Sequence, residues 1–170
     1  GLAYANEGSA NGGAWTDPFL ELVAPGGSPG VTNPFIVASG NNLIDIVWSE
    51  GTGGLEPNVY HARSKDGGNS WPIQGIIAAT GSSSQFPSAA VDQTGGVHVV
   101  WQDPDHFLSG PPPRFGGTIF YSKGTDTGAT MTWSTPIEIS QETTLNQYDA
   151  REPEIIVNGS WIQVVYTEFV

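Results

Sequence analysis

Ser64-Lys-Asp-Gly-Gly-Asn-Ser-Trp71 has the pattern Ser-x-Asp-x-Gly-x-Ser-Trp and follows the β-rich run at 58–63. An Asp followed by two glycines favours a tight turn, because Asp bonds its own backbone and Gly tolerates positive φ. A Trp directly after such a turn anchors the next strand by burying a large ring. The octet therefore predicts a turn that joins two β-strands.

The octet recurs twice in altered form. The segment 122–133 keeps Asp-x-Gly-x-Thr but has two extra residues before its Trp, and the segment 9–15 has Asn11 in place of the Asp and one residue fewer. Other markers repeat alongside it. Three β-rich runs end in an aromatic, a polar residue and an acid: Trp48-Ser-Glu50, Trp101-Gln-Asp103 and Tyr166-Thr-Glu168. Three strands open near a proline: Pro34, Pro87 and Pro153. Self-similarity at roughly 50 to 60 residues is typical of a propeller or a solenoid.

The octet resembles the Asp box of the sialidase-type (BNR) repeat, which joins the third and fourth strands of a β-propeller blade. The resemblance implies an all-β chain with three blades of four antiparallel strands. It also implies that Asp66 and Asp126 serve the turns rather than a reaction. Gly 23, Pro 13 and many short β-rich runs without helical periodicity favour the same class.

The spacing of the repeated motifs is regular only when the chain is treated as a circle, with the N-terminus following the C-terminus. One blade is therefore expected to be divided between the two ends. We expect residues 1–24 to form the outer strands of that split blade and residues 149–170 its inner strands. The ranges 33–80 and 86–140 are the complete blades. The segment from Pro104 to Gly117 is expected to be a long surface loop.

Three blades do not close a ring, and an open arc exposes sheet edges at both ends. A head-to-tail pair of chains would remove both problems, because each C-terminal strand pair would be completed by the N-terminal pair of the other copy. The sequence therefore predicts a six-bladed propeller in a domain-exchanged homodimer. A fragment of a longer propeller is the alternative.

Composition limits the partners. Seventeen acids against five bases give a formal charge of −12, which disfavours nucleic acid and anionic membranes. The chain has no cysteine, so disulfides and thiolate metal sites are excluded, and no run approaches the ~18 apolar residues of a membrane span. An acidic, lysine-poor, cysteine-free chain slightly favours a secreted or periplasmic bacterial protein.

In the family that the chain resembles, the Asp boxes lie on the face opposite the binding site. The resemblance therefore places the site in the loops between blades and between second and third strands. Those loops carry many ionisable groups: Glu50, Glu56, Asp103, Asp105, His106, Arg114, Glu142, Tyr148, Asp149, Arg151, Glu152 and Glu168.

Sialidases bind the substrate carboxylate with three arginines and use a tyrosine nucleophile with an acid/base Asp. Ala150-Arg-Glu-Pro153 resembles the Arg-x-Pro of that family, so Arg151 is the one position carried over. The matching segments 32–34 and 85–87 lack arginine, which puts the triad in doubt. We expect binding or hydrolysis of a glycan, with these candidates for catalysis: Arg151, Glu152, Tyr148, Asp149 and His106. The candidates for binding are Glu50, Asp103, Glu168, Arg114, Gln85 and Asn33.

Two alternatives remain open. An axial Ca²⁺ held by Asp149, Glu152 and Glu154, near Asn33 and Gln85, would suit a metal-dependent ester or phosphoester hydrolase. A lectin or adhesion module without catalysis is the other. For any one of the recurring acids at the strand ends, the structural interpretation is a solvated cap. No cofactor is required by the sequence.

Overall fold

The computed structural model describes residues 2–4, 20–22, 30–40, 42–51, 57–79, 83–108, 114–140 and 149–169. Within these ranges the regular structure consists of strands, and every pair of neighbouring strands is antiparallel. The all-β class with antiparallel strands is therefore confirmed. No helix in the described part of the chain has the length and apolarity to cross a membrane.

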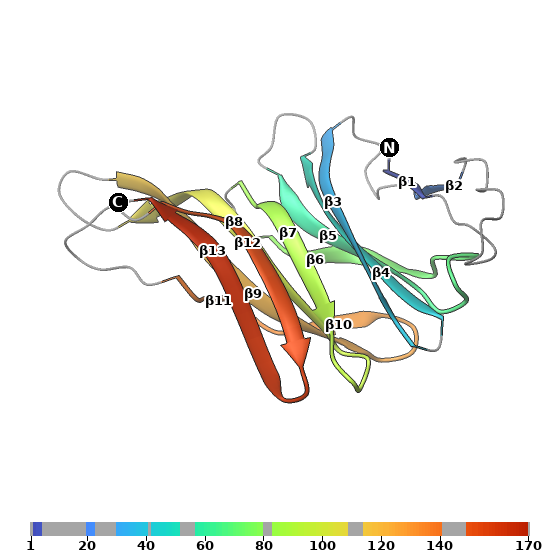
Figure 1. Cartoon of the computed structure of the whole chain (residues 1–170). Helices are drawn as coiled ribbons and strands as arrows, with labels where there is room; N and C mark the ends of the chain where they lie inside the picture. Colours follow the sequence, from blue (N-terminus) through green and yellow to red (C-terminus); the bar gives the residue numbers. More distant parts are fainter. Residues whose placement is uncertain are drawn as a thin grey trace, which may run out of the picture.

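Two larger sheets form the middle of the chain (Figure 1). The first has the order β3-β4-β5-β6, and the second has the order β10-β9-β8-β7 with β11 also paired to β9. The strand bounds are β3 (Gly30–Ser39), β4 (Leu43–Gly51), β5 (Asn58–Ser64), β6 (Ile73–Ala78), β7 (Gln85–Val91), β8 (Val97–Leu108), β9 (Arg114–Asp126), β10 (Met131–Trp133) and β11 (Ile137–Glu138).

Each end of the chain contributes a two-stranded sheet. One is β1 (Leu2–Tyr4) with β2 (Leu20–Leu22), and the other is β12 (Asp149–Asn158) with β13 (Trp161–Phe169). Among the described strands these two sheets do not pair with each other, and they lie at opposite ends of the molecule (Figure 1). The completion of a split blade by a second chain therefore stays a prediction.

The sheets stack face to face, with β3 against β7 and β12 against β7 and β8. Strand alternation explains the stacking, because successive side chains point to opposite faces of a sheet. Val47 contributes to the core between the first and second sheets, and its neighbour Trp48 contributes to the core on the other face of the first sheet. The next core along the chain lies between the second sheet and β12–β13, and it includes Val100 and Ile155.

In three of the four sheets, the first strand has a β-bulge at its proline. The register shifts between Thr32 and Phe35, between Gln85 and Ser88, and between Arg151 and Glu154. A proline donates no backbone hydrogen bond, so it is tolerated where the ladder is already interrupted. Each of the repeated prolines in the sequence therefore marks the same backbone feature, a β-bulge.

The expected surface loop from Pro104 to Gly117 is mostly strand, which corrects the sequence prediction. β8 continues to Leu108 and β9 starts at Arg114. The register shifts between Asp103 and His106, and pairing resumes at His106 with Gly116. Pro104 lies within that irregularity, so it interrupts the ladder without ending the hairpin.

Candidate functional site

The sheets have two different ends, which we call the proline end and the turn end. The proline end holds the bulges before Pro34, Pro87 and Pro153 together with the last residues of β4 and β13. The turn end holds the turns at 64–71 and 126–130. Because β3 and β4 are antiparallel, with Val31 opposite Glu50 and Ser39 opposite Leu43, the acid of each aromatic-polar-acid motif lies at the proline end.

The residue before each proline has a left-handed backbone. The φ angles are 52° at Asn33, 49° at Phe86 and 52° at Glu152. Non-glycine residues adopt this region rarely, and strain of this kind is common at functional sites. Because three equivalent positions share this conformation, the backbone at the proline end has the same local shape in all three sheets.

Arg151 carries the most exposed cation described at the proline end. Its side chain is 51% exposed, Nε donates to Asp149 Oδ2 at 2.8 Å, and Nη2 forms an ion pair with the same oxygen. Asp149 Oδ1 accepts from the backbone N–H of Gly117 at 3.1 Å. The hydrogen bond from Arg151 lowers the pKa of Asp149, and the same bond raises the pKa of Arg151. Both groups are therefore charged at neutral pH.

Two further bonds attach the start of β12 to the second sheet. The backbone N–H of Glu152 donates to Gln102 Oε1 at 2.8 Å, and Ser88 Oγ donates to Glu154 Oε2 at 2.7 Å. Gln85, equivalent to Arg151, donates through Nε2 to Ser83 Oγ at 2.7 Å. The strand that carries Arg151 is thus fixed by side chains that the sequence prediction did not include, Gln102 and Ser88.

The three recurring acids differ in their surroundings. Glu50 and Asp103 are buried, while Glu168 is exposed. Glu50 Oε2 accepts a hydrogen bond from Trp48 Nε1 at 3.1 Å. The pKa of Tyr60 is raised, mainly by the burial of Tyr60 and to a smaller extent by the negative charge of Glu50. The interpretation of these acids as solvated caps is therefore wrong for Glu50 and Asp103, which are 1% and 0% exposed.

The remaining candidates are placed only in part. Tyr148 lies outside the described residues. Arg114 and His106 belong to the extension of β9 and β8, where they pair with Leu108 and Gly116 through the backbone. Asn33 is partly buried at the first bulge.

The proposed calcium ligands do not form a group in the described part of the chain. No three His, Asp or Glu side chains there lie together as a metal ion needs. Asp149 is paired with Arg151, and Glu154 accepts from Ser88.

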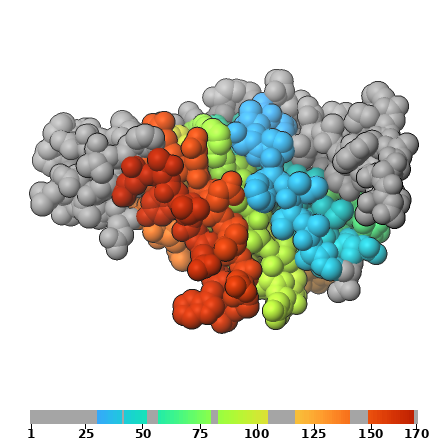
Figure 2. Space-filling model, viewed as in Figure 1, coloured from blue at the N-terminus to red at the C-terminus, as the bar shows by residue number. Residues whose placement is uncertain are grey.

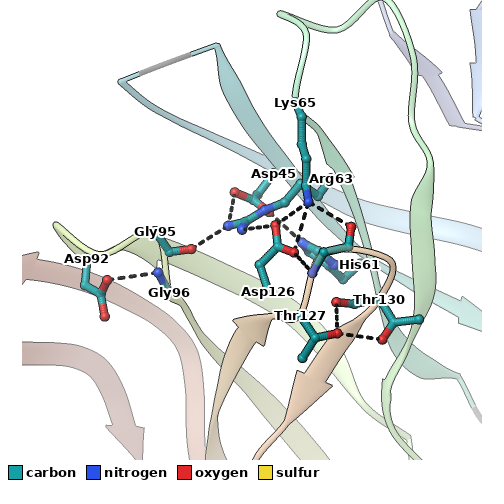
Figure 3. A network of polar contacts seen from close by, with 11 residues as sticks. Asp45, His61, Arg63, Lys65, Asp92, Gly95, Gly96, Asp126, Thr127 and Thr130 are labelled. Atoms are coloured by element: carbon teal, nitrogen blue, oxygen red, sulfur yellow. Dashed lines mark hydrogen bonds and ion pairs between the residues drawn. The ribbon is translucent and has the colours of Figure 1, made fainter.

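The turn end contains a buried charge network that the sequence analysis missed (Figure 3). Arg63 donates from Nε and Nη2 to the two carboxylate oxygens of Asp45 at 2.8 and 3.0 Å. His61 Nε2 lies 2.6 Å from Asp45 Oδ1, and all three residues are at most 1% exposed. The sequence signal for this network was the presence of Asp45, His61 and Arg63 within otherwise apolar strands.

The same network crosses to the second sheet. Arg63 donates to Asp126 Oδ2 at 3.2 Å and to the carbonyl oxygen of Gly95 at 2.8 Å, and Lys65 pairs with Asp126 at 2.8 Å. Asp66, in contrast, bonds within its own turn, where Ser70 donates from its backbone N–H and its hydroxyl. These bonds lower the pKa of Asp66 to about 2. The turn end is therefore a structural joint between two sheets.

We expect His61 to make stability depend on pH. Burial lowers its pKa below the ordinary 6.5, and this outweighs the opposite effect of Asp45. The unfolded chain therefore binds a proton near pH 6.5 that the folded chain does not, so stability falls as pH drops below that value. Urea unfolding at pH 7.5 and 5.5 should show a larger loss for the native chain than for His61→Gln. Equal losses would contradict the neutral, buried His61.

Together these sheets define a sialidase-like β fold. The structure is similar to that of a Hadza microbial sialidase, Hz136, with a TM-score of 0.56 and 16% sequence identity. The match covers 76% of this chain and 30% of the sialidase chain, so this chain spans less than a third of that protein. No protein-family model matches the chain, and no curated protein matches it.

Proposed function

We propose that this chain binds glycans at the proline end of its sheets, with Arg151 as the main polar contact. The observation that carries the proposal is the half-exposed, ionised guanidinium on a bulged strand, held by Asp149. The likeness to the sialidase fold supports the ligand class as an analogy.

An acidic sugar suits this arrangement best. A guanidinium donates two parallel hydrogen bonds to a carboxylate, a geometry that a lysine does not provide. Asp149 and the bulge orient Arg151 before the ligand arrives, which lowers the entropy lost on binding. The formal charge of −12 disfavours an extended anionic surface as the ligand, whereas the exposed guanidinium of Arg151 suits a single carboxylate.

Binding is better supported than hydrolysis. The positions equivalent to Arg151 hold Thr32 and Gln85, so the described repeats do not supply an arginine triad. A general acid must hold a proton at working pH, and Asp149 is a poor one because Arg151 lowers its pKa. No grouping of described carboxylates favours the calcium-dependent hydrolase.

Titration calorimetry with sialyllactose and with lactose tests this proposal. The native chain should bind the acidic sugar more tightly, and Arg151→Ala should weaken that binding by about 10- to 150-fold, since a hydrogen bond to a charged group contributes about 1.5–3 kcal/mol. Arg151→Lys should retain the charge but lose part of the affinity.

The matched control is Lys65→Ala, which removes a partly exposed cation from the turn end. It should leave the affinity unchanged. Equal affinities for native chain and Arg151→Ala, or equal losses for both alanine variants, would contradict a site at Arg151. A fluorogenic sialoside assay of the same proteins separates binding from turnover.

A further inference from the structure

Apolar side chains remain exposed on both sides of the stacked sheets, as a group on β12–β13 and at a single position of β3. Ile156, Trp161 and Val165 of β12–β13 are 59%, 74% and 68% exposed, and Ile36 of β3 is 55% exposed. Monomeric proteins expose single apolar residues often, but a group on one strand pair is less common. The surfaces lie on opposite sides of β7 (Figure 1), and Figure 2 shows β12–β13 and β3 as separate bands with β7 between them.

The repeats show what normally covers such surfaces. Val47, Val100 and Val165 hold the same place in the register, each opposite the residue that follows the strand-opening proline. Ile36, Ala89 and Ile155 are likewise equivalent, each two residues after that proline. Strand geometry thus defines two corresponding faces on every sheet.

Within the chain these faces meet twice. Val47 of the first sheet shares a core with Ala89 of the second, and Val100 of the second sheet shares a core with Ile155 of β12. All four of these side chains are buried. The third pair in the series is Val165 with Ile36, and both of its members are exposed.

The next position on the first strand follows the same rule. Val37 packs in the core between the first two sheets, and its equivalent Ala90 packs in the following core. The third member, Ile156, is exposed. Two independent positions therefore point to the same missing contact.

We propose that a second copy of this chain makes that contact, with β12–β13 of each copy packed against β3 of the other. The two halves of the interface lie on opposite sides of one molecule, so a single chain with these stacked sheets does not bring them together. A head-to-tail contact between copies closes into a ring when its rotation is two-fold. Two copies of three stacked sheets would then form one closed assembly, with Val165 and Ile36 of both copies buried.

The open strand pairs support the same occupant. Among the described strands, β12–β13 and β1–β2 are each two-stranded, whereas the other two sheets have four strands in the main path. A second copy would place a β1–β2 pair beside β13 and complete a four-stranded sheet. This proposal does not depend on the ligand, because it rests on packing alone.

Charge predicts how the association responds to salt. Each chain carries a formal −12, so two copies repel each other through solvent. Apolar burial must overcome this repulsion, and added salt screens it. The association should therefore strengthen between low and moderate NaCl, unlike one held by ion pairs.

Sedimentation equilibrium tests the contact. The native chain should show twice the chain mass of 17.9 kDa, and Val165→Asp should weaken association by about 30-fold or more. Ile36→Lys should weaken it as well. A mixture of Val165→Asp and Ile36→Lys should form the dimer again, because one interface pairs Asp with Lys and the other keeps Val with Ile.

The control is Ile137→Asp, at a residue that is 54% exposed but outside both surfaces, and it should dimerise normally. Thermal melts of each variant confirm folding. A native chain that stays monomeric at its highest soluble concentration overturns the proposal, as do open-ended oligomers or a mixture that fails to dimerise. Glycan titration of the Val165→Asp monomer is a separate readout that reports on Arg151 alone.

Discussion

Asp45→Ala is expected to lower the free energy of unfolding by about 3–5 kcal/mol, because it leaves buried charge without its counter-ion. Asp45 is 0% exposed and accepts two hydrogen bonds from Arg63, with His61 also in contact. Without Asp45, the guanidinium would keep Asp126 and the Gly95 carbonyl as its hydrogen-bond partners within the described network. Urea unfolding at fixed protein concentration measures the loss.

Lys65→Ala is the matched control for Asp45→Ala. It removes a cation that is 36% exposed and belongs to the same network. A surface ion pair of this kind contributes about 0.2–1 kcal/mol. If the two variants lost similar small amounts, the network would not stabilise the joint between the first and second sheets.

Trp101→Ala is expected to cost about 3–5 kcal/mol, the range typical of removing a large aromatic side chain from a core. Trp101 is 0% exposed and lies in the core between the first two sheets, with its ring stacked on Phe120 at 6.0 Å. The cavity would open where Val47 and Ala89 also pack. The two sheets would therefore pack less tightly against each other and bury less apolar surface.

Denaturant unfolding of Trp101→Ala beside Trp101→Phe and Ile137→Ala checks this expectation. Phe retains most of the packing and should lose less, while the mostly exposed Ile137 should contribute little. A loss below about 1 kcal/mol for Trp101→Ala would mean that the sheets are not held by this core, given the usual range for core truncations.

Repetition made the fold accessible from sequence. The octet at 64–71, the aromatic-polar-acid runs and the prolines repeat together, and this repetition predicts the all-β, antiparallel class that the described strands confirm. Pro104 was misleading, because a proline predicts a loop unless the strand pairing around it is known. The pairing of His106 with Gly116 is a long-range fact that local residue pattern does not contain.

The candidate site was accessible only in part. Arg151 was identified from its motif, but its pairing with Asp149 and the attachment of β12 through Gln102 and Ser88 depend on contacts between sheets. The burial of Glu50 was not predictable either, since strand position alone does not show which face of a sheet is covered. Ring closure involves a partner, so it stays a prediction.

Mapping backbone chemical shifts during a sialyllactose titration tests most directly which end of the sheets binds the ligand. The largest changes are expected at the proline end, at Arg151, Glu152 and Gln85, with little change at Lys65 and Gly128 of the turn end. Changes concentrated at the turn end, or the same pattern with Arg151→Ala as with the native chain, would contradict this expectation.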